Sequence, residues 1–305
     1  MKKLIAIIAM TLAMAAQANE IITIVYAFNV ADTRANYSRQ LIREANTAQN
    51  KYTFIIEGKP GAGGSIAARH VAATPNTILA STGAFFVRPN FFPNESHSLE
   101  DFRELLVQTT TPMSAASVKY KFFKDIPADA PLLIGVSGLG VVSHLSAVQL
   151  MTKYPNATIV PFKSTSDALL SLLGGDLDIS IGFMGEQEHW VGQKTPGGKS
   201  VAVLGITGPK TINGHPTYTS SGFPQVFTKM NNPSHLVVPK SMPNEKFKEI
   251  REILYNASKS KSVMQTYEVD FGSIVDVPTN GLDSWYKEQS DHWAKMSNAA
   301  KATMK

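Results

Sequence analysis

The sequence contains no cysteine, no long apolar segment after its first residues and no dense cluster of basic side chains. Without cysteine, the 305-residue chain forms neither disulfides nor the acylated cysteine that anchors a lipoprotein, so its stability has to come from packed cores. No stretch after residue 18 has the about 20 apolar residues that a membrane-spanning helix needs. The formal net charge is only +5, and no basic stripe interleaved with aromatic residues is present, which argues against nucleic acid as a partner.

Motifs of catalysis and metal binding are also sparse. The seven histidines are dispersed, and none has the i, i+4 spacing of a zinc-binding helix. Residues 186–189 place two acids beside a histidine, but no second cluster matches them. Residues 258–261 fit the S-x-x-K pattern without the further motifs that accompany it in serine acylases. The sequence therefore predicts a protein without catalytic residues, metal or cofactor.

The N-terminus has the three parts of a cleavable signal peptide. Lys2 and Lys3 supply the positive region, residues 4–15 the short apolar region, and residues 16–18 the small-x-small cleavage site. A buried N-terminal helix is the alternative. We expect residues 1–18 to be removed, leaving an exported mature chain of 287 residues with a formal charge of +3.

The rest of the chain alternates short β-branched runs with segments of helical period, which is typical of an α/β fold with parallel strands. Helices are expected at residues 244–258 and 282–300, the second with Trp285 and Trp293 on one core-facing side. The expected strands are residues 21–27, 52–57, 77–81, 105–110, 132–136, 158–161, 178–182, 201–207 and 235–238.

Two extended, small-residue-rich segments, residues 109–117 and 228–233, are candidate passages between two lobes. A chain that leaves one lobe, builds a second and returns needs two such passages. We therefore expect lobe one to comprise residues 19–112 and 232–305, and lobe two residues 113–231.

The first glycine-rich segment, residues 58–69, follows a strand and opens a helix. Gly61, Gly63 and Gly64 allow tight turning and close approach of a guest, and Ser65 is the expected N-cap. Unpaired amides at a helix start favour an anion. The spacing fits neither a phosphate-binding P-loop nor a dinucleotide fingerprint. A tight connector without a ligand is the alternative.

The second glycine-rich segment, residues 135–145, also joins a strand to a helix, with Ser143 as expected N-cap. It resembles the turn that carries a hydrolase nucleophile, but Leu139 occupies the position of the last glycine. His144 is either a donor to a guest or a surface residue. A serine hydrolase using Ser137 and His144 remains the second candidate function.

Two further segments place polar groups after strands. In residues 161–178, Phe162 and Lys163 follow a strand, a helix begins near residues 164–166, and Gly174 is expected to end it. Lys163 either neutralises an acid or is solvated.

Asn29 and Asp32 follow the first strand, at the edge where open α/β sheets bind ligands. Asp32 is alternatively a helix N-cap.

Three motifs, taken in their order along the chain, resemble the extracytoplasmic solute receptors of the tripartite tricarboxylate transporter system, the Bug family. The motifs are residues 59–65, residues 137–145, and residues 161–163 followed by 172–178. The resemblance implies a type II periplasmic binding fold, in which two α/β lobes joined by two crossing strands close on a ligand. It implies a monomeric, non-catalytic periplasmic receptor that captures a small carboxylate, an organic acid or amino acid, and docks on membrane transporter subunits. A receptor that presents its ligand to a sensor protein is an alternative.

The resemblance also assigns ligand contacts, mainly backbone amides and hydroxyls of the two glycine loops. The first loop departs from the family, because residues 28–31 replace a usual proline and paired glycines, although Asp32 keeps its place. The assigned residues are Gly63, Gly64, Ser65 and, more weakly, Thr82 in lobe one, and Ser137, Gly140, Ser143, Phe162 and Lys163 in lobe two.

Overall fold

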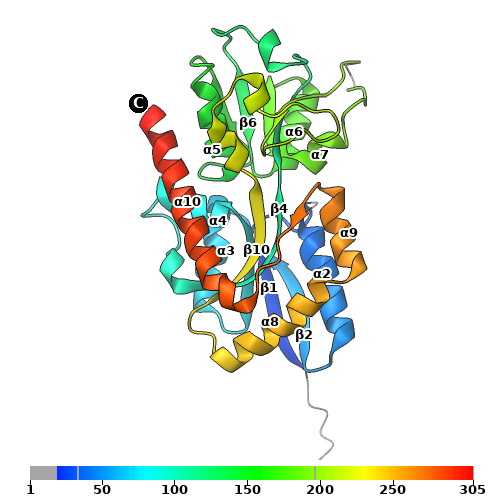
Figure 1. Ribbon diagram of the computed structural model, residues 1–305, viewed down its shortest axis with the longest axis vertical. Helices are drawn as coiled ribbons and strands as arrows, with labels where there is room; N and C mark the ends of the chain where they lie inside the picture. The colour runs from blue at the N-terminus through cyan, green and yellow to red at the C-terminus, as the bar shows by residue number, and fades with distance from the viewer. Residues whose placement is uncertain (1–18, 33, 196, 305) are drawn as a thin grey trace, which may run out of the picture.

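The computed structural model describes residues 19–32, 34–195 and 197–304. The predicted signal peptide, residues 1–18, lies outside the described residues. The chain folds into two sheets with their own helices, one above the other along the long axis (Figure 1). The α/β prediction with two lobes is thereby confirmed. We call the part around the six-stranded sheet the first lobe and the part around the five-stranded sheet the second lobe.

The first sheet has the strand order β11-β4-β10-β3-β1-β2. Strand β1 runs parallel to both β2 and β3, whereas β10 is antiparallel to β3 and β4, and β11 is antiparallel to β4. Its strands are β1 (Glu20–Tyr26), β2 (Tyr52–Gly58), β3 (Thr77–Thr82), β4 (Phe102–Thr111), β10 (Asn232–Pro239) and β11 (Ser273–Ile274).

The helices of this lobe bury one face each. Tyr37, Leu41 and Ala45 of α2 recur every four residues and are buried, which is the spacing that aligns side chains along one side of a helix. Helix α8 has the range expected from the sequence. The helices are α2 (Ala35–Ala48), α3 (Ser65–Ala73), α4 (Ala84–Phe91), α8 (Asn244–Ser258), α9 (Lys261–Val269) and α10 (Leu282–Thr303).

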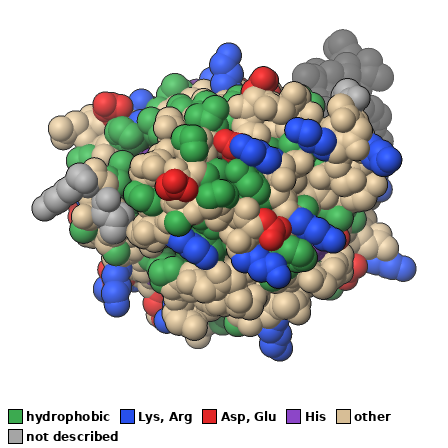
Figure 2. Space-filling view, turned by 90° about the horizontal axis from the view of Figure 1, so that it is seen from above, with side chains coloured by type: hydrophobic (Ala, Val, Ile, Leu, Met, Phe, Trp, Pro, Cys, Tyr) green, Lys and Arg blue, Asp and Glu red, His purple; other side chains and the backbone are tan. Residues whose placement is uncertain are grey.

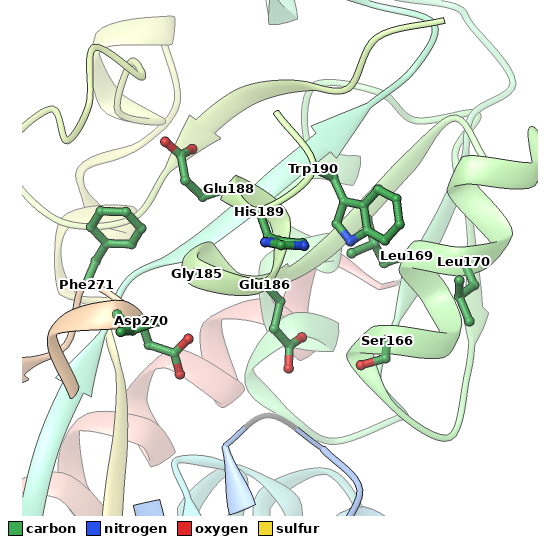
Figure 3. A pocket seen from close by; sticks show the side chains of 11 residues that line it. Ser166, Leu169, Leu170, Gly185, Glu186, Glu188, His189, Trp190, Asp270 and Phe271 are labelled. Atoms are coloured by element: carbon green, nitrogen blue, oxygen red, sulfur yellow. The ribbon is translucent and has the colours of Figure 1, made fainter. Parts of the chain in front are cut away.

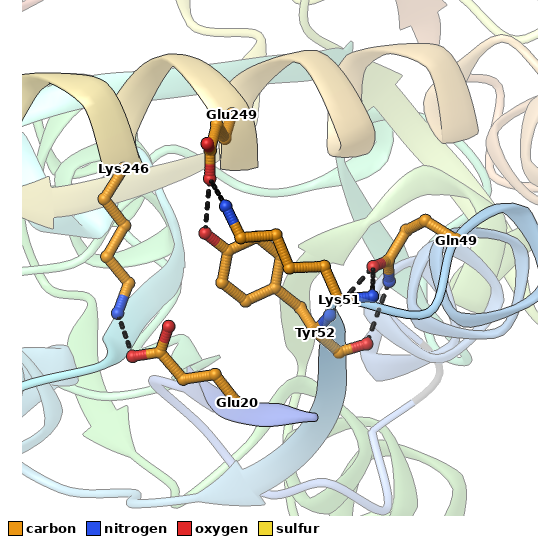
Figure 4. Close-up of polar contacts among 6 residues, drawn as sticks. All are labelled: Glu20, Gln49, Lys51, Tyr52, Lys246 and Glu249. Atoms are coloured by element: carbon orange, nitrogen blue, oxygen red, sulfur yellow. Dashed lines mark hydrogen bonds and ion pairs between the residues drawn. The ribbon is translucent and has the colours of Figure 1, made fainter. Parts of the chain in front are cut away.

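Polar contacts fix α8 to the edge of the first sheet (Figure 4). The Glu249 carboxylate accepts hydrogen bonds from Lys51 Nζ at 2.5 Å and from the Tyr52 hydroxyl at 2.6 Å. One turn earlier on α8, Lys246 pairs with Glu20 at the start of β1. These contacts lie at the end of the sheet opposite to the second lobe, so they hold the lobe together without touching the space between the lobes.

The second sheet has the order β7-β6-β8-β5-β9, with β6 parallel to β7 and β8, and β5 antiparallel to β8 and β9. Its strands are β5 (Met113–Ser117), β6 (Leu133–Val136), β7 (Thr158–Pro161), β8 (Ile179–Phe183) and β9 (Ala202–Ile206), and its helices α5 (Val142–Met151), α6 (Thr165–Gly174) and α7 (Met184–Glu188). Seen from its outer end, this lobe has a group of apolar side chains near the middle, with lysine and arginine side chains distributed around it (Figure 2).

The chain passes between the sheets twice. Only Pro112 separates the end of β4 from the start of β5, and β10 leads back from the second lobe into the first sheet. Helix α10 extends from the first lobe up beside the second, and packs against both α4 and α5. Its Trp293 is fully buried, as expected, and Trp285 is partly buried against Phe86.

Three predicted helix ends were wrong. The N-cap of α3 is Gly64 and not Ser65, and the N-cap of α5 is Val141 and not Ser143; neither cap makes a side-chain hydrogen bond. The left-handed residue after α6 is Gly175, with φ of +92°, while Gly174 is still helical. In the first two cases the serine hydroxyl hydrogen-bonds to another side chain, Ser65 to His97 and Ser143 to Ser137, and this contact competes with capping. Asp32 is not a cap either, because Arg34 occupies that position of α2.

No helix within the described ranges is long and apolar enough to cross a membrane.

Candidate functional site

The two glycine-rich loops face each other across the space between the lobes. Gly63, in the 3-10 turn η1 (Ala62–Gly64), has φ of +58°, a left-handed conformation that favours glycine. A Cβ built on Gly63 would lie 3.5 Å from the carbonyl oxygen of Leu139 and 3.3 Å from Cγ1 of Val141. The first loop therefore approaches the second so closely that even a Cβ on Gly63 would be in contact with the opposite lobe.

A cavity of about 690 Å³ opens beside this contact. Residues of both lobes line it, so its shape depends on how the lobes sit on each other. Carbon and backbone groups form most of the wall, with one lysine, one arginine and one aspartate. The lining residues are Phe28, Asn29, Pro60, Gly61, Ala62, Gly63, Arg88, Ser137, Gly138, Leu139, Phe162, Lys163, Ser164 and Asp167.

The eleven residues predicted for the ligand site fall into three groups. Five line the large cavity: Asn29, Gly63, Ser137, Phe162 and Lys163. Asp32 and Thr82, together with Ser137, line an adjoining smaller recess. The remaining four, Gly64, Ser65, Gly140 and Ser143, lie behind this lining and shape the loops.

Several amides expected to bind an anion already have partners. The Gly64 N–H donates to the carbonyl of Gly61, and the Ser65 N–H to that of Ala62. The Gly140 N–H donates to Nδ1 of His144, and the Ser137 N–H to the hydroxyl of Ser143.

Five other amides of the loops have no partner within the described residues, and all five residues line the large cavity. They belong to Gly61, Ala62, Gly63, Gly138 and Leu139. The unpaired donors that line the cavity are thus at the tips of the two loops.

The Ser65 hydroxyl points into the first lobe, where it lies 3.1 Å from Nδ1 of His97. Burial lowers the pKa of His97 to about 4, so its imidazole is neutral at physiological pH. The other ring nitrogen, Nε2, donates to the carbonyl of Phe85 at 3.0 Å. With Nε2 as the donor, Nδ1 is the acceptor, and the Ser65 hydroxyl donates to it. Ser65 thus ties the first glycine loop to the core of its own lobe.

The Ser137 hydroxyl lies 3.0 Å from the hydroxyl of Ser143, and no hydrogen bond joins Ser137 to His144 among the described residues. His144 is buried, so its reading as a surface residue was wrong. Burial lowers the pKa of His144 to about 4, with the positive charge of Arg88 as a lesser cause. A nucleophile–base contact, which a serine hydrolase needs, is not formed by this pair.

The smaller recess, of about 30 Å³, lies where the lobes meet above the crossing strands. Its lining shares Phe28, Ser137 and Ser164 with the large cavity, so the two spaces adjoin. The lining residues are Tyr26, Phe28, Asp32, Arg34, Thr82, Ser137, Ser164, Thr165, Phe183 and Glu186.

Arg34 is the buried cation of this recess, with only 3% of its surface exposed. Its Nη2 donates to the hydroxyls of Thr111 at 3.2 Å and of Ser234, which belong to the two crossing strands. The guanidinium carbon lies 3.8 Å from the ring centre of Phe183 in the second lobe. Nε and Nη1 have no hydrogen-bond partner in the part of the chain that the structure describes.

Two carboxylates face the same recess. Burial, together with the negative charges of Asp270 and Asp32, raises the pKa of Glu186 to about 8 against the opposing effect of Arg34. Burial and the charge of Asp167 raise the pKa of Asp32 to about 6. Oε2 of Glu186 is buried and unpaired within the described chain.

Glu186 also borders a groove of about 590 Å³ on the far side of the recess, between α6 and α7 of the second lobe and the end of α9 (Figure 3). Leu169, Leu170 and Trp190 form an apolar wall there, while the carboxylates of Glu186 and Asp270 both point toward the first lobe. Within the described ranges, no group of three or more histidine or acidic side chains could hold a metal ion.

Sequence reasoning missed Arg34, Arg88 and Glu186 as parts of the site. Arg34 is the last residue of the segment after the first strand in which Asn29 and Asp32 were predicted to bind the ligand. Its position at the carboxyl end of that strand could therefore have identified it as a site residue. Glu186 was set aside because a matching acidic cluster was sought along the sequence, whereas its neighbours Asp32 and Asp270 come from the other lobe.

No protein-family model matches the chain. Among curated proteins, the chain is similar to the UPF0065 protein in the TAR-I ttuE-ttuC' intergenic region of Agrobacterium vitis, with 31% identity over 141 residues. The match covers 41% of this chain and 40% of that relative, so it spans less than half of the relative's length.

Solved structures match over nearly the whole chain. The periplasmic binding protein BugD has a TM-score of 0.79 at 20% identity, covering 92% of this chain and 98% of BugD. MatC from Rhodopseudomonas palustris with bound malate has a TM-score of 0.75 at 18% identity, covering 91% and 99%. An R. palustris protein with adipate has a TM-score of 0.79 at 19% identity, covering 92% and 97%.

The predicted resemblance to Bug-type receptors is therefore confirmed, and the chain has the periplasmic binding protein fold.

Proposed function

We propose that this protein is an exported periplasmic receptor of the Bug type that captures a small carboxylate-bearing molecule, an organic acid or amino acid, without chemical conversion. The single observation that carries the proposal is the pair of glycine loops, one from each lobe, that face each other beside a cavity of about 690 Å³. Solved neighbours with the same fold hold malate and adipate, both small carboxylates.

The chemistry of the cavity suits an anion. The unpaired amides of Gly63, Gly138 and Leu139 are donors without an acceptor among the described residues, and Lys163 adds a positive charge to the lining. Phe28 and Phe162 supply apolar surface for the body of the ligand. Asn29 and Ser137 add neutral polar groups at its rim.

Capture follows from the two-lobe construction. Each lobe has its own sheet, and the crossings near Pro112 and at the start of β10 are the places where backbone rotation separates the lobes. A ligand that contacts both loops binds the closed arrangement better than the open one and shifts the population toward it. The closed, loaded receptor, acting as a monomer, then docks on membrane transporter subunits.

The first experiment identifies the ligand. Native mass spectrometry of the purified protein detects any molecule retained from the cell, and a thermal-shift screen of organic acids and amino acids follows. We expect a true ligand to stabilise the fold by about 2.7 kcal/mol at a hundredfold excess over its Kd. A screen in which no carboxylate raises the Tm would count against the proposal.

A pair of charge variants then tests the cavity. Lys163→Gln removes the cation on its wall and should weaken carboxylate binding by about tenfold in calorimetry, the range of a charge-assisted hydrogen bond. Lys210→Gln removes an exposed lysine of the same lobe and should leave binding unchanged. Equal affinities for the two variants would show that the ligand lies elsewhere.

The hydrolase alternative has its own test. Purified protein is assayed on a panel of esters, together with Ser137→Ala. We expect no turnover above the variant's rate, because the Ser137 hydroxyl is bonded to Ser143 and not to a base. Turnover abolished by Ser137→Ala would replace binding by catalysis as the function.

A further inference from the structure

The recess between the lobes combines unpaired hydrogen-bond donors with unpaired acceptors. On the donor side, Nε and Nη1 of the 97%-buried Arg34 have no partner within the described chain. On the acceptor side, Oε2 of Glu186 is buried and unpaired, and the Asp32 carboxylate makes no hydrogen bond or ion pair to a described residue. Unpaired buried groups of this kind are costly and rare, so a bound molecule that pairs them is the economical explanation.

The three charged residues of the recess differ in how deeply they are buried. Arg34 is the most buried and is held at the base by Thr111 and Ser234 of the crossing strands. Asp32 and Glu186 are half-buried and come from opposite lobes, so they flank the recess from its two sides. The recess itself, about 30 Å³, admits one or two atoms the size of water, and it adjoins the large cavity that can hold the remainder of a ligand.

Charge decides which head group fits. A carboxylate alone would satisfy Arg34 but would add a negative charge beside Asp32 and Glu186, with Asp167 and Asp270 close behind them. An amine alone would satisfy the two carboxylates and leave the guanidinium edge unpaired. A head group with an ammonium next to a carboxylate pairs both sides, because its carboxylate meets Arg34 and its ammonium meets the two acids.

We propose that the recess, together with the adjoining edge of the large cavity, is the head-group subsite for an amino-acid ligand, with a carboxylate oxygen reaching Arg34 and the ammonium held between Asp32 and Glu186. The side chain of the ligand extends into the large cavity beside Phe28 and Phe162. Because Asp32 and Glu186 belong to different lobes, the ammonium also holds the lobes closed. This inference rests on the proposed function and narrows its ligand class from carboxylates in general to amino acids.

The raised pKa values of Asp32 and Glu186 support this assignment. Burial and neighbouring acids favour the neutral form of both carboxylates, and in Glu186 they outweigh the opposing charge of Arg34. In the ligand-free recess two carboxylates face one cation, and the ammonium places a positive charge between those two carboxylates.

The test compares ligands that differ only at the amino position. The twenty proteinogenic amino acids, the matching 2-hydroxy acids and the matching unsubstituted acids are screened by thermal shift against the full mature chain. We expect at least one amino acid to raise the Tm, and its hydroxy and unsubstituted counterparts to bind about tenfold or more weakly by calorimetry. If no amino acid stabilises the protein, or the hydroxy acid binds as tightly, the inference is wrong.

The screen also separates this inference from the proposed function. Stabilisation by hydroxy or unsubstituted acids alone would leave carboxylate capture intact and remove the amino-acid subsite. Stabilisation by none of the three sets would overturn both.

Variants then locate the ammonium. Glu186→Gln and Asp32→Asn keep the size and hydrogen bonding of the side chain but remove one charge each. Each variant should bind the amino acid about tenfold or more weakly, while its affinity for the 2-hydroxy acid should change far less. Asp176→Asn, at an exposed position after α6, removes a carboxylate from the second lobe without touching the recess and should leave both affinities unchanged.

Circular dichroism and the ligand-free Tm confirm that each variant is folded, and either recess variant suffices if the other is unstable. Amino-acid affinity that is unchanged in a folded Glu186→Gln and a folded Asp32→Asn protein would overturn the assignment. An equal loss of affinity for the amino acid and for the 2-hydroxy acid would also overturn the assignment. Asp32 and Glu186 would then act on a group that both ligands have and not on the ammonium.

Discussion

Arg88, on helix α4 of the first lobe, donates a hydrogen bond from Nη1 to the carbonyl oxygen of Leu139 in the second lobe, at 2.7 Å. Arg88 is 7% exposed, and its guanidinium stacks on Phe92, with the guanidinium carbon 3.8 Å from the ring centre. The bond joins the lobes at the same place where Gly63 and Leu139 approach each other. The closed arrangement therefore has a direct polar contact of the protein's own, in addition to whatever the ligand adds.

We expect Arg88→Ala to favour the open arrangement. A hydrogen bond from a charged group is worth about 1.5–3 kcal/mol, so ligand affinity should fall by about tenfold or more. Small-angle X-ray scattering of the ligand-free protein should show a larger radius of gyration. Arg69→Ala is the matched control, because Arg69 is an exposed arginine of the first lobe whose Nη1 donates to a carbonyl of that same lobe. Equal behaviour of the two variants would mean that the Leu139 contact does not hold the lobes.

Gly63→Ala should reduce both ligand affinity and the free energy of unfolding, with the larger effect on affinity. The added Cβ would lie 3.2 Å from Cδ of Arg88 and 3.3 Å from Cγ1 of Val141 in the opposite lobe, so these two neighbours have to shift slightly, and the left-handed backbone adds about 1–2 kcal/mol of strain. Gly175→Ala carries the same kind of strain at φ of +92° but meets nothing within 4 Å. Calorimetry should show weaker binding only for Gly63→Ala, whereas denaturant unfolding should show a loss of stability for both.

His235 and Glu104 form a fully buried pair that joins the crossing strands β10 and β4, with Nδ1 3.0 Å from Oε2. His235→Ala leaves the Glu104 carboxylate buried without its partner, and we expect a loss of about 3–5 kcal/mol in the free energy of unfolding. Replacing both residues by leucine should recover a large part of that loss. Urea unfolding of the three proteins checks this, with His292→Ala as control; a double variant as unstable as His235→Ala would contradict the argument.

The sequence was sufficient for the architecture because its signals are local. Alternation of β-branched and helical segments placed α8 at residues 244–258 without error, and the two glycine loops were recognised as connections from a strand to a helix. Hydroxyl roles were not predictable. Ser65 and Ser143 read as N-caps, but their side chains bond to His97 and Ser137, partners that only the folded loops bring near.

The charged recess was hidden for the same reason. Asp32 was recognised because it stands at a strand end, whereas the significance of Arg34 and Glu186 depends on which of their atoms lack partners after the lobes meet. No spacing in the sequence encodes that, since the two residues are 152 positions apart and belong to different lobes. Only the tertiary arrangement shows an arginine and two acids around one small space.

The recess also predicts how binding depends on pH. Glu186 faces Asp270, Arg34 and Asp32, and Asp32 faces Asp167 in turn; with burial as the main cause, the pKa values are raised to about 8 and about 6. In the ligand-free protein these acids keep protons that the unfolded chain has already lost, so their contribution to stability falls as the pH rises from about 5 to 8. An ammonium ligand binds the ionised forms and should therefore bind more tightly as the pH rises over that range.

A carboxylate without an ammonium has the opposite dependence, because protonated Glu186 can donate to it and ionised Glu186 repels it. Calorimetry across this pH range, with the best amino acid and its 2-hydroxy counterpart, therefore gives slopes of opposite sign if the ammonium lies between Asp32 and Glu186. Glu186→Gln should flatten the upper part of the amino-acid profile, near its pKa of about 8, and Asp32→Asn the lower part, near about 6. If the affinities of the two ligands changed with pH in the same direction, Asp32 and Glu186 would not contact the ammonium. Only a direct contact with the ammonium gives the amino acid a pH dependence different from that of the 2-hydroxy acid.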